Sequence, residues 1–232
     1  MIKLIISDFD GTIVKFPVEP FQSSWDAIGN ILEGNKRKKW FECRDFYLDK
    51  IYKTEKKEEK IEIEKKWFQD EANLLAGEKI ADLLNRIEIV YTSGVKEFFE
   101  EMKKRGKIIG ILSSGLDFVI KKAVDEIGFD IIICSELEKK EGILTGKDIT
   151  HIDLQNKVNL FQRICQEQGV EAHEVVYFGD HFNCIPCLKA AGLGIAVNAK
   201  TKEVKGAAKA SIEDFRDAIK IIENYEGENH GT

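Results

Sequence analysis

The chain has 232 residues, 43% of them hydrophobic, and a formal net charge of −6 at pH 7. That length allows one sizeable core, or one core with a smaller appended domain. An acidic chain has no surplus of positive charge to hold a phosphate backbone, so nucleic acid is not an expected partner. No stretch approaches roughly eighteen uncharged residues, which predicts no membrane contact and a cytoplasmic protein. We expect a monomer or a homodimer.

The cysteines exclude a secreted disulfide framework. Their number is odd, and a chain of this length does not need covalent staples. We expect most of them to be small buried apolar residues. They are Cys43, Cys134, Cys165, Cys184 and Cys187.

The first predicted element is a buried strand in "KLIISDF", Lys3 to Phe9, which runs into the tight loop "DGT". Residues 15–90 contain no convincing strand and hold all three tryptophans. Within them, the run "KTEKKEEKIEIEKKW" is typical of a solvated helix face. We therefore predict a helical cap inserted at 15–90. At this point of the chain it would lie over the carboxyl ends of the strands, where open parallel sheets bind ligands.

After the insertion, apolar runs alternate with amphipathic segments such as "GVKEFFEEMKKRG". Strands that are apolar throughout indicate a parallel sheet covered by helices on both faces. The expected fold class is α/β, a Rossmann-like doubly wound parallel sheet, with residues 1–14 and 91–232 as the core. A last helix is predicted to start at Ser211, as its N-cap. The predicted strands occupy residues 107–114, 129–134, 174–180 and 193–197.

Polar side chains follow several of these strands. Asp8 and Asp10 end the first strand, and Ser113 ends the second. Asp180 ends a later strand, and Lys157 begins a helix. Acids, a lysine and a hydroxyl brought together suit a divalent cation and a phosphoryl group, because hard oxygens hold Mg²⁺ and the cation shields the acids from each other.

The order of these motifs resembles that of the haloacid dehalogenase (HAD) superfamily phosphatases. The motifs are "DFDGT", an apolar strand ending in Ser113, Lys157 ahead of a helix, and "VVYFGDHFN" followed by "AAGLGIAV". The resemblance covers residues 1–14 and about 91–225. The helical insertion, the turn "SSGLDF" and the segment "EGILTGKD" are similar to the phosphoserine phosphatase-like branch.

The resemblance implies a phosphoric monoester hydrolase that uses Mg²⁺, or Mn²⁺ or another divalent cation, on a small phosphorylated metabolite. Asp8 would be the nucleophile that forms an aspartyl-phosphate, and Asp10 the general acid and base. The carboxylates of Asp8 and Asp180 and the backbone carbonyl of Asp10 would hold the metal. The residues implied for phosphate binding are Ser113, Ser114, Lys157 and Asn183.

The chain departs from the family pattern at the fourth motif, where "GDHFNC" stands in place of GDGxND. Cys184 replaces the second acid, which predicts weaker Mg²⁺ binding because a thiol is a poor ligand for a hard cation. Softer metals such as Mn²⁺ or Zn²⁺ then remain open, with His181 and Cys184 as conceivable ligands. Ser114 also replaces a glycine of the pattern.

Three other interpretations stay open. Cys184 and Cys187 form a Cys-x-x-Cys pair that could be redox active. A binding or regulatory relative could have kept the fold without turnover, and a phosphomutase could transfer the phosphoryl group within a sugar. The candidates to hold a charged substrate in the cap are Glu19, Arg44 and Arg86. The aromatic residues of the insertion favour a bulkier or less zwitterionic alcohol than phosphoserine.

Overall fold

The computed structural model describes residues 1–17, 23–150, 152 and 157–228. Its centre is a seven-stranded sheet in the order β6-β5-β4-β1-β7-β8-β9. All neighbouring pairs are parallel except β5 and β6, which form an antiparallel hairpin. The expected doubly wound α/β architecture is confirmed. The strands are β1 (Leu4–Ser7), β4 (Ile108–Leu116), β5 (Ile131–Lys140), β6 (Ile143–Thr150), β7 (Val175–Gly179), β8 (Leu193–Val197) and β9 (Ala210–Ile212).

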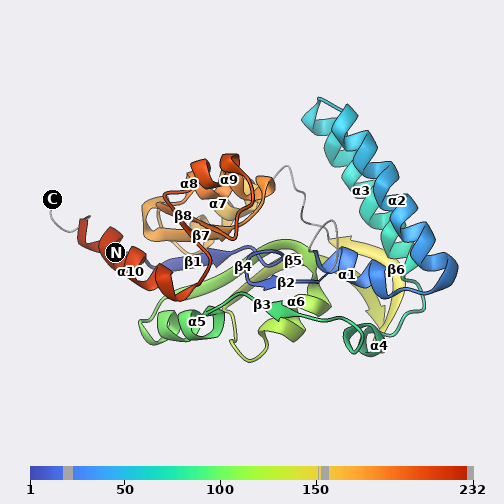
Figure 1. Cartoon of the computed structure of the whole chain (residues 1–232), viewed down its shortest axis with the longest axis horizontal. Helices are drawn as coiled ribbons and strands as arrows, with labels where there is room; N and C mark the ends of the chain where they lie inside the picture. The colour runs from blue at the N-terminus through green and yellow to red at the C-terminus, as the bar shows by residue number, and fades with distance from the viewer. Residues whose placement is uncertain (18–22, 151, 153–156, 229–232) are drawn as a thin grey trace.

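Helices cover both faces of this sheet (Figure 1). One face carries α5 (Val95–Lys104), α6 (Asp117–Val124) and α10 (Arg216–Glu228). The other carries α7 (Lys157–Glu167), α8 (Ile185–Ala190) and α9 (Lys202–Ala207). The strands between them are buried on both sides, and every residue of β1, β7 and β8 is buried. This burial explains why their sequences are continuously apolar rather than alternating.

The described part of the insertion, residues 15–17 and 23–90, forms four helices, α1 (Ser24–Ile31), α2 (Gly34–Lys53), α3 (Lys57–Leu74) and α4 (Ile80–Leu84). The helices α2 and α3 form a long pair that projects from the body beside β6 (Figure 1). Two short strands, β2 (Val14–Lys15) and β3 (Val90–Tyr91), pair antiparallel where the insertion leaves and rejoins the core. Lys15 and Val90 therefore lie in strands, although no strand was expected in 15–90. A two-residue strand is too short to leave a periodic pattern.

The tryptophans build the interior of the insertion. The ring of Trp25 lies 6.3 Å from that of Trp40 and 4.9 Å from that of Phe68, measured between centroids. Gly29 makes this packing possible, because a Cβ there would lie 2.2 Å from the Trp40 ring. Residues 55–59, in the middle of the charge run, are exposed as expected.

The insertion is joined to the sheet along β6. Gly77 N–H donates to the carbonyl of Leu144 at 2.8 Å, and Ile80 N–H donates to that of Gly142 at 2.9 Å. The side-chain amide of Gln69 continues this pairing like a peptide group: it donates to the carbonyl of Gly146 at 2.9 Å and accepts from Asp148 N–H at 3.3 Å. These contacts fix the insertion to the outer side of the hairpin.

The start of the last helix was predicted wrongly. Ser211 lies in β9, and α10 begins at Arg216. The carboxylate of Asp214 accepts a hydrogen bond from Arg216 N–H at 2.9 Å. An aspartate just ahead of a helix satisfies a free backbone N–H in the same way as a serine, so the two polar candidates Ser211 and Asp214 made the boundary ambiguous.

Candidate active site

The acids meet at the carboxyl ends of the central strands. In the sheet register, Ser7 of β1 lies between Ile111 of β4 and Phe178 of β7. Asp8 and Asp180 follow directly on this edge, since Asp8 comes after Ser7 and Asp180 after Gly179. In a parallel sheet all these strand ends point the same way, so residues far apart in sequence come together.

Asp8 is the centre of the cluster and is buried. Its Oδ2 lies 2.6 Å from Nζ of Lys157 and accepts a hydrogen bond from the Cys184 thiol at 2.8 Å. Its Oδ1 accepts from Phe9 N–H at 2.7 Å. Both oxygens of the carboxylate are thus oriented by neighbours that belong to three different parts of the chain.

Asp8 and Lys157 each stabilise the ionised form of the other. Burial works to raise the pKa of Asp8, but the Lys157 ammonium and the hydrogen bonds that Asp8 accepts outweigh burial and lower it. Burial works to lower the pKa of Lys157, and the charge of Asp8 raises it above the usual value instead. The pair is therefore a carboxylate and an ammonium at neutral pH, with 1% of Lys157 exposed.

The pKa of Asp10, unlike that of Asp8, is raised. Burial raises its pKa to about 7, and the charges of Asp8 and Asp180 add to this effect. The hydroxyl of Ser24 donates to its Oδ2 at 2.9 Å. The pKa values of these two carboxyls, two residues apart, are thus shifted in opposite directions. Asp8 stays ionised, and Asp10 can gain and lose a proton near neutral pH. Such a split is typical of a nucleophile and a general acid.

Asp180 is held by the loop that follows β1. Thr12 Oγ1 donates to its Oδ1 at 3.0 Å. A Cβ at Gly11, which has φ of 76°, would lie 2.1 Å from Oδ2 of Asp180, so the glycine is needed for this close approach. Burial, followed by the charge of Asp8, raises the pKa of Asp180 to about 7.

Asp8, Asp180 and Cys184 each offer one ligand atom, and these atoms lie within 4.8 Å of one another. Because Asp8 and Asp180 are like charges in a buried place, a cation between them would relieve their repulsion. Two carboxylate oxygens suit Mg²⁺, whereas the sulfur of Cys184 suits softer metals. The residues therefore fit a divalent cation. Cys184 supplies a thiol at the position where a third carboxylate would give an all-oxygen site.

The remaining predicted residues lie around this cluster. Ser113 is buried, and its Oγ accepts a hydrogen bond from Gly115 N–H at 3.2 Å. The backbone carbonyl of Ser114 accepts from the Trp25 indole at 2.9 Å. Asn183 is buried beside Cys184, whose thiol lies 3.7 Å from Asn183 Oδ1. His181 is exposed and does not belong to the group of clustered ligand atoms.

Sequence reasoning missed Ser24, Thr12 and Trp25 as parts of the site. Thr12 was visible in "DFDGT", but its target Asp180 lies 168 positions away. Ser24 and Trp25 stand in the insertion, where a serine before a helix is expected only to cap it. Their contacts with the core depend on how the insertion packs, which no local pattern encodes.

The Cys-x-x-Cys pair does not have the character of a redox motif. Cys184 and Cys187 are both fully buried and are free thiols. Burial raises the pKa of Cys187 to about 12, and burial together with the Asp8 charge raises that of Cys184 well above its usual value. Reactive thiols have lowered pKa values and some exposure, so neither cysteine has the character of a reactive thiol.

The two candidate cap arginines make contacts inside the insertion. Arg44 is buried and pairs with Asp26 at 3.3 Å and with Asp45 at 2.8 Å. Arg86 is exposed and pairs with Glu33 at 2.9 Å. Glu19, the third candidate, lies outside the described residues.

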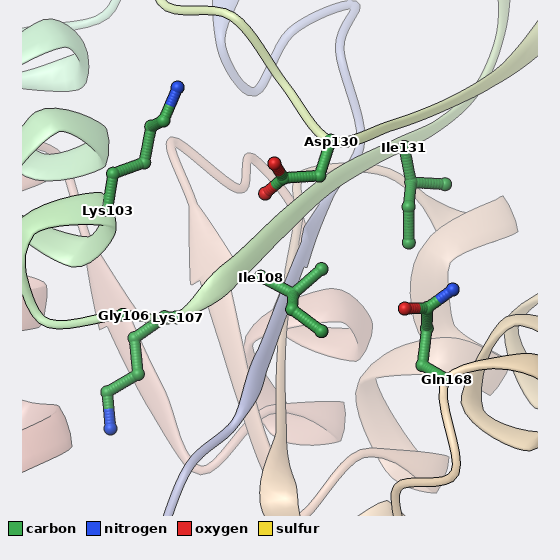
Figure 2. Close-up of a pocket in the computed structure, with 7 residues that line it drawn as sticks. All are labelled: Lys103, Gly106, Lys107, Ile108, Asp130, Ile131 and Gln168. Carbon is green, nitrogen blue, oxygen red and sulfur yellow. The ribbon is translucent and has the colours of Figure 1, made fainter.

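A pocket of about 400 Å³ lies at the opposite edge of the sheet, where β4 and β5 begin (Figure 2). Its three charged side chains already have partners. Lys103 donates to the carbonyl of Gly128 at 2.8 Å, Lys107 donates to Glu226 at 3.0 Å, and Asp130 accepts from Ile109 N–H at 2.9 Å. A ligand there would have to compete with these contacts, so the strand ends around Asp8 remain the candidate site.

Comparisons with known proteins identify the family. Residues 5–189 match the model of the haloacid dehalogenase-like hydrolase family. A phosphoserine phosphatase of Methanocaldococcus jannaschii is 32% identical over 148 residues, which cover 62% of this chain and 69% of that protein. One of Archaeoglobus fulgidus is 32% identical over 151 residues, covering 64% of this chain and 43% of that protein.

Solved structures extend the likeness to nearly the whole chain. Phosphoserine phosphatase in its apo form aligns with a TM-score of 0.69 at 25% identity, over 95% of this chain and 98% of that one. A phospho-aspartyl intermediate analogue of phosphoserine phosphatase aligns with a TM-score of 0.66 at 28% identity, over the same shares.

The fold and these relatives define the class of protein, a phosphatase built on a doubly wound sheet. This chain belongs to the haloacid dehalogenase-like hydrolase family. It is similar to the phosphoserine phosphatase branch of that family. Within the described parts of the chain, no helix is long and apolar enough to cross a membrane.

Proposed function

We propose that the protein hydrolyses the phosphomonoester of a small metabolite through an aspartyl-phosphate on Asp8. The contact that carries this proposal is the 2.6 Å pair between the buried Asp8 carboxylate and the Lys157 ammonium. It holds a nucleophile in one orientation beside a cation that can offset the charge of a transferred phosphoryl group. A similar solved structure is described as a phospho-aspartyl intermediate analogue, which supports the same assignment.

Asp10 acts in this proposal as the general acid, and afterwards as the general base. It gives a proton to the leaving alcohol when Asp8 attacks phosphorus, and it takes a proton from the water that later hydrolyses the aspartyl-phosphate. Its pKa of about 7 suits both steps, because each protonation state is well populated near neutral pH.

The proposed metal ligands are the carboxylates of Asp8 and Asp180 and the backbone carbonyl of Asp10. Mg²⁺ is the proposed cation, with Mn²⁺ as the alternative that the Cys184 thiol favours. When bound, the cation offsets negative charge on the phosphoryl group.

Four side chains are proposed to bind the phosphoryl oxygens. Ser113 accepts from Gly115 N–H, which leaves the hydroxyl proton of Ser113 to donate to an oxygen of the substrate. Lys157 supplies the positive charge, and Ser114 and Asn183 supply further hydrogen bonds. The insertion is the proposed cap, since the Trp25 indole already reaches the carbonyl of Ser114 and can help to exclude water.

The proposed substrate is a small phosphorylated alcohol, amino acid or sugar. Phosphoserine is the first compound to test, because the relatives are named for it. Arg44 pairs with Asp26 and Asp45 within the insertion, which favours a less zwitterionic alcohol. A panel of phosphomonoesters ranked by kcat/KM decides between these expectations: phosphoserine at the top would overturn the preference for a less zwitterionic compound.

The test of the activity is phosphate release from p-nitrophenyl phosphate with Mg²⁺. We expect Asp8→Asn to lower kcat by on the order of a thousandfold or more, because an amide cannot act as the nucleophile. Asp49→Asn is the matched control, since Asp49 is an exposed acid that pairs with Lys53. Failure of the wild-type protein to release phosphate with any divalent metal would instead indicate a binding protein. Transfer within a sugar phosphate without release would indicate a mutase.

A further inference from the structure

Ser24, in the first turn of α1, is fully buried against Asp10 and the end of β4. Its Oγ donates a hydrogen bond to Oδ2 of Asp10 at 2.9 Å and accepts one from Leu116 N–H at 3.1 Å. A backbone N–H can only donate, and the hydroxyl has a single proton. An ionised Asp10 can only accept, so the hydroxyl proton of Ser24 is directed at it, and the insertion is in direct contact with this acid.

This arrangement distinguishes the two oxygens of Asp10. Oδ2 is an acceptor because it receives the proton of Ser24. Oδ1 is buried and has no hydrogen-bond partner among the described residues. The carbonyl oxygen of a carboxylic acid accepts a hydrogen bond better than its hydroxyl oxygen, so while Ser24 donates to Oδ2 the proton of a protonated Asp10 is favoured on Oδ1.

The contact is closely packed. A Cβ at Gly115 would lie 2.9 Å from Oγ of Ser24 and 3.0 Å from Oδ2 of Asp10, so no side chain fits between the β4 backbone and this pair. The neighbouring Trp25 indole fixes α1 to the same end of β4 through its hydrogen bond to the carbonyl of Ser114. Ser24 is thus held in place from both sides.

We propose that Ser24 is a positioning residue: its hydroxyl orients the Asp10 carboxyl so that Oδ1 delivers the proton to the leaving oxygen of the substrate. This inference rests on the proposed role of Asp10. As the Asp8 oxygen forms its bond to phosphorus, the bond from phosphorus to the ester oxygen breaks. The electron pair of that bond takes the Oδ1 proton, which yields a neutral alcohol and the Asp10 carboxylate.

The dependence on the leaving group tests the proposal. An alkyl phosphate such as β-glycerophosphate needs a proton on its leaving oxygen, whereas p-nitrophenolate is a stable anion that leaves without one. We expect Ser24→Ala to lower kcat/KM for β-glycerophosphate by roughly 10- to 100-fold, and for p-nitrophenyl phosphate by less than about threefold. The ratio of the two values does not depend on the fraction of folded protein, so lost stability cannot imitate the effect.

Ser23→Ala is the matched control. Ser23 is the N-cap of α1, and its Oγ accepts from Asp26 N–H at 3.1 Å without contacting Asp10. We expect this variant to destabilise α1 and to keep the wild-type ratio of the two kcat/KM values. An equal fall for both substrates in Ser24→Ala would overturn the positioning role while leaving the proposed function intact. A wild-type protein that hydrolyses neither substrate would overturn the proposed function, and this inference with it.

Discussion

At the scale of single residues, Oδ2 of Asp8 is shared between an ammonium and a thiol. Lys157 lies 2.6 Å and the Cys184 sulfur 2.8 Å from this oxygen. A carboxylate in place of the thiol would place a third negative charge beside those of Asp8 and Asp180. A bound cation could offset that charge. Cys184 leaves the cluster with less negative charge and one hard ligand fewer, so we expect a weaker attraction for the proposed Mg²⁺ than an all-carboxylate cluster would have.

Replacing the thiol by an acid should reverse this effect. We expect Cys184→Asp to tighten Mg²⁺ binding by about tenfold, and Mn²⁺ binding by less, because Mg²⁺ depends more strongly on oxygen ligands. Titration calorimetry on metal-free protein measures both affinities.

Cys187→Ser serves as the control for this variant, since Cys187 is equally buried but lies outside the group of clustered ligand atoms. It should leave both affinities within about twofold of the wild-type values. Unchanged Mg²⁺ affinity in Cys184→Asp would show that position 184 does not influence the metal.

At the scale of elements, the insertion depends on the hairpin of β5 and β6. Gly146 has φ of 90°, and a Cβ there would lie 2.9 Å from Cβ of Ala76. Gly142, in the turn of the same hairpin, has φ of 77°, and a Cβ added to it would have no neighbour within 4 Å among the described residues. Both glycines have a positive φ, which is unfavourable for any other residue type. Only at Gly146 would an added side chain also collide with the insertion.

This pair gives a matched test of the contact. We expect Gly142→Ala to cost about 1 kcal/mol of unfolding free energy through backbone strain. Gly146→Ala should cost roughly 1 to 3 kcal/mol more, because it also pushes α3 away from β6. Urea unfolding of both variants measures the difference, and equal losses would mean that the contact with Ala76 contributes nothing.

The second strand of this hairpin, β6, could not be predicted from the sequence. The central strands were predictable because burial on both faces makes them apolar throughout. In β6 the inward positions include Leu144, Gly146 and Asp148, and only the first is apolar, so the period of two is not visible. At the site, strand ends predicted Asp8 and Asp180. Ser24 was not predictable because its contact with Asp10 depends on the packing of a separate group of helices.

At the scale of the whole molecule, the buried acids couple stability to pH. The pKa values of Asp10 and Asp180 are raised to about 7, whereas an unfolded aspartate titrates near pH 4. Between about pH 4 and 7 the folded protein therefore binds more protons at these positions than the unfolded chain. The stability of the metal-free protein contributed by these groups is present at low pH and is lost as pH rises toward 7.

Thermal unfolding in EDTA checks this prediction. Asparagine resembles a protonated aspartate, so Asp180→Asn should gain stability relative to the wild type as pH rises from about 5 to about 7.5. Comparing the two proteins cancels the contribution of carboxylates that do not interact with Asp180, whereas the pKa of Asp10 is lowered in the variant because the charge of Asp180 is gone. A difference in melting temperature that stays constant over this range would contradict the raised pKa of Asp180. Added Mg²⁺ should stabilise the wild type at the higher pH, because it binds the ionised acids of the folded state.

The covered edge of β6 bears on whether copies of the protein aggregate. A free edge strand offers backbone groups to any other extended chain, which is a common route to aggregation. Here the segment that contains Gly77 and Ile80, together with the Gln69 amide, already occupies the outward groups of Gly142, Leu144, Gly146 and Asp148. The insertion thereby protects this edge of the sheet from strand addition, so conditions that detach α3 should expose an aggregation-prone edge.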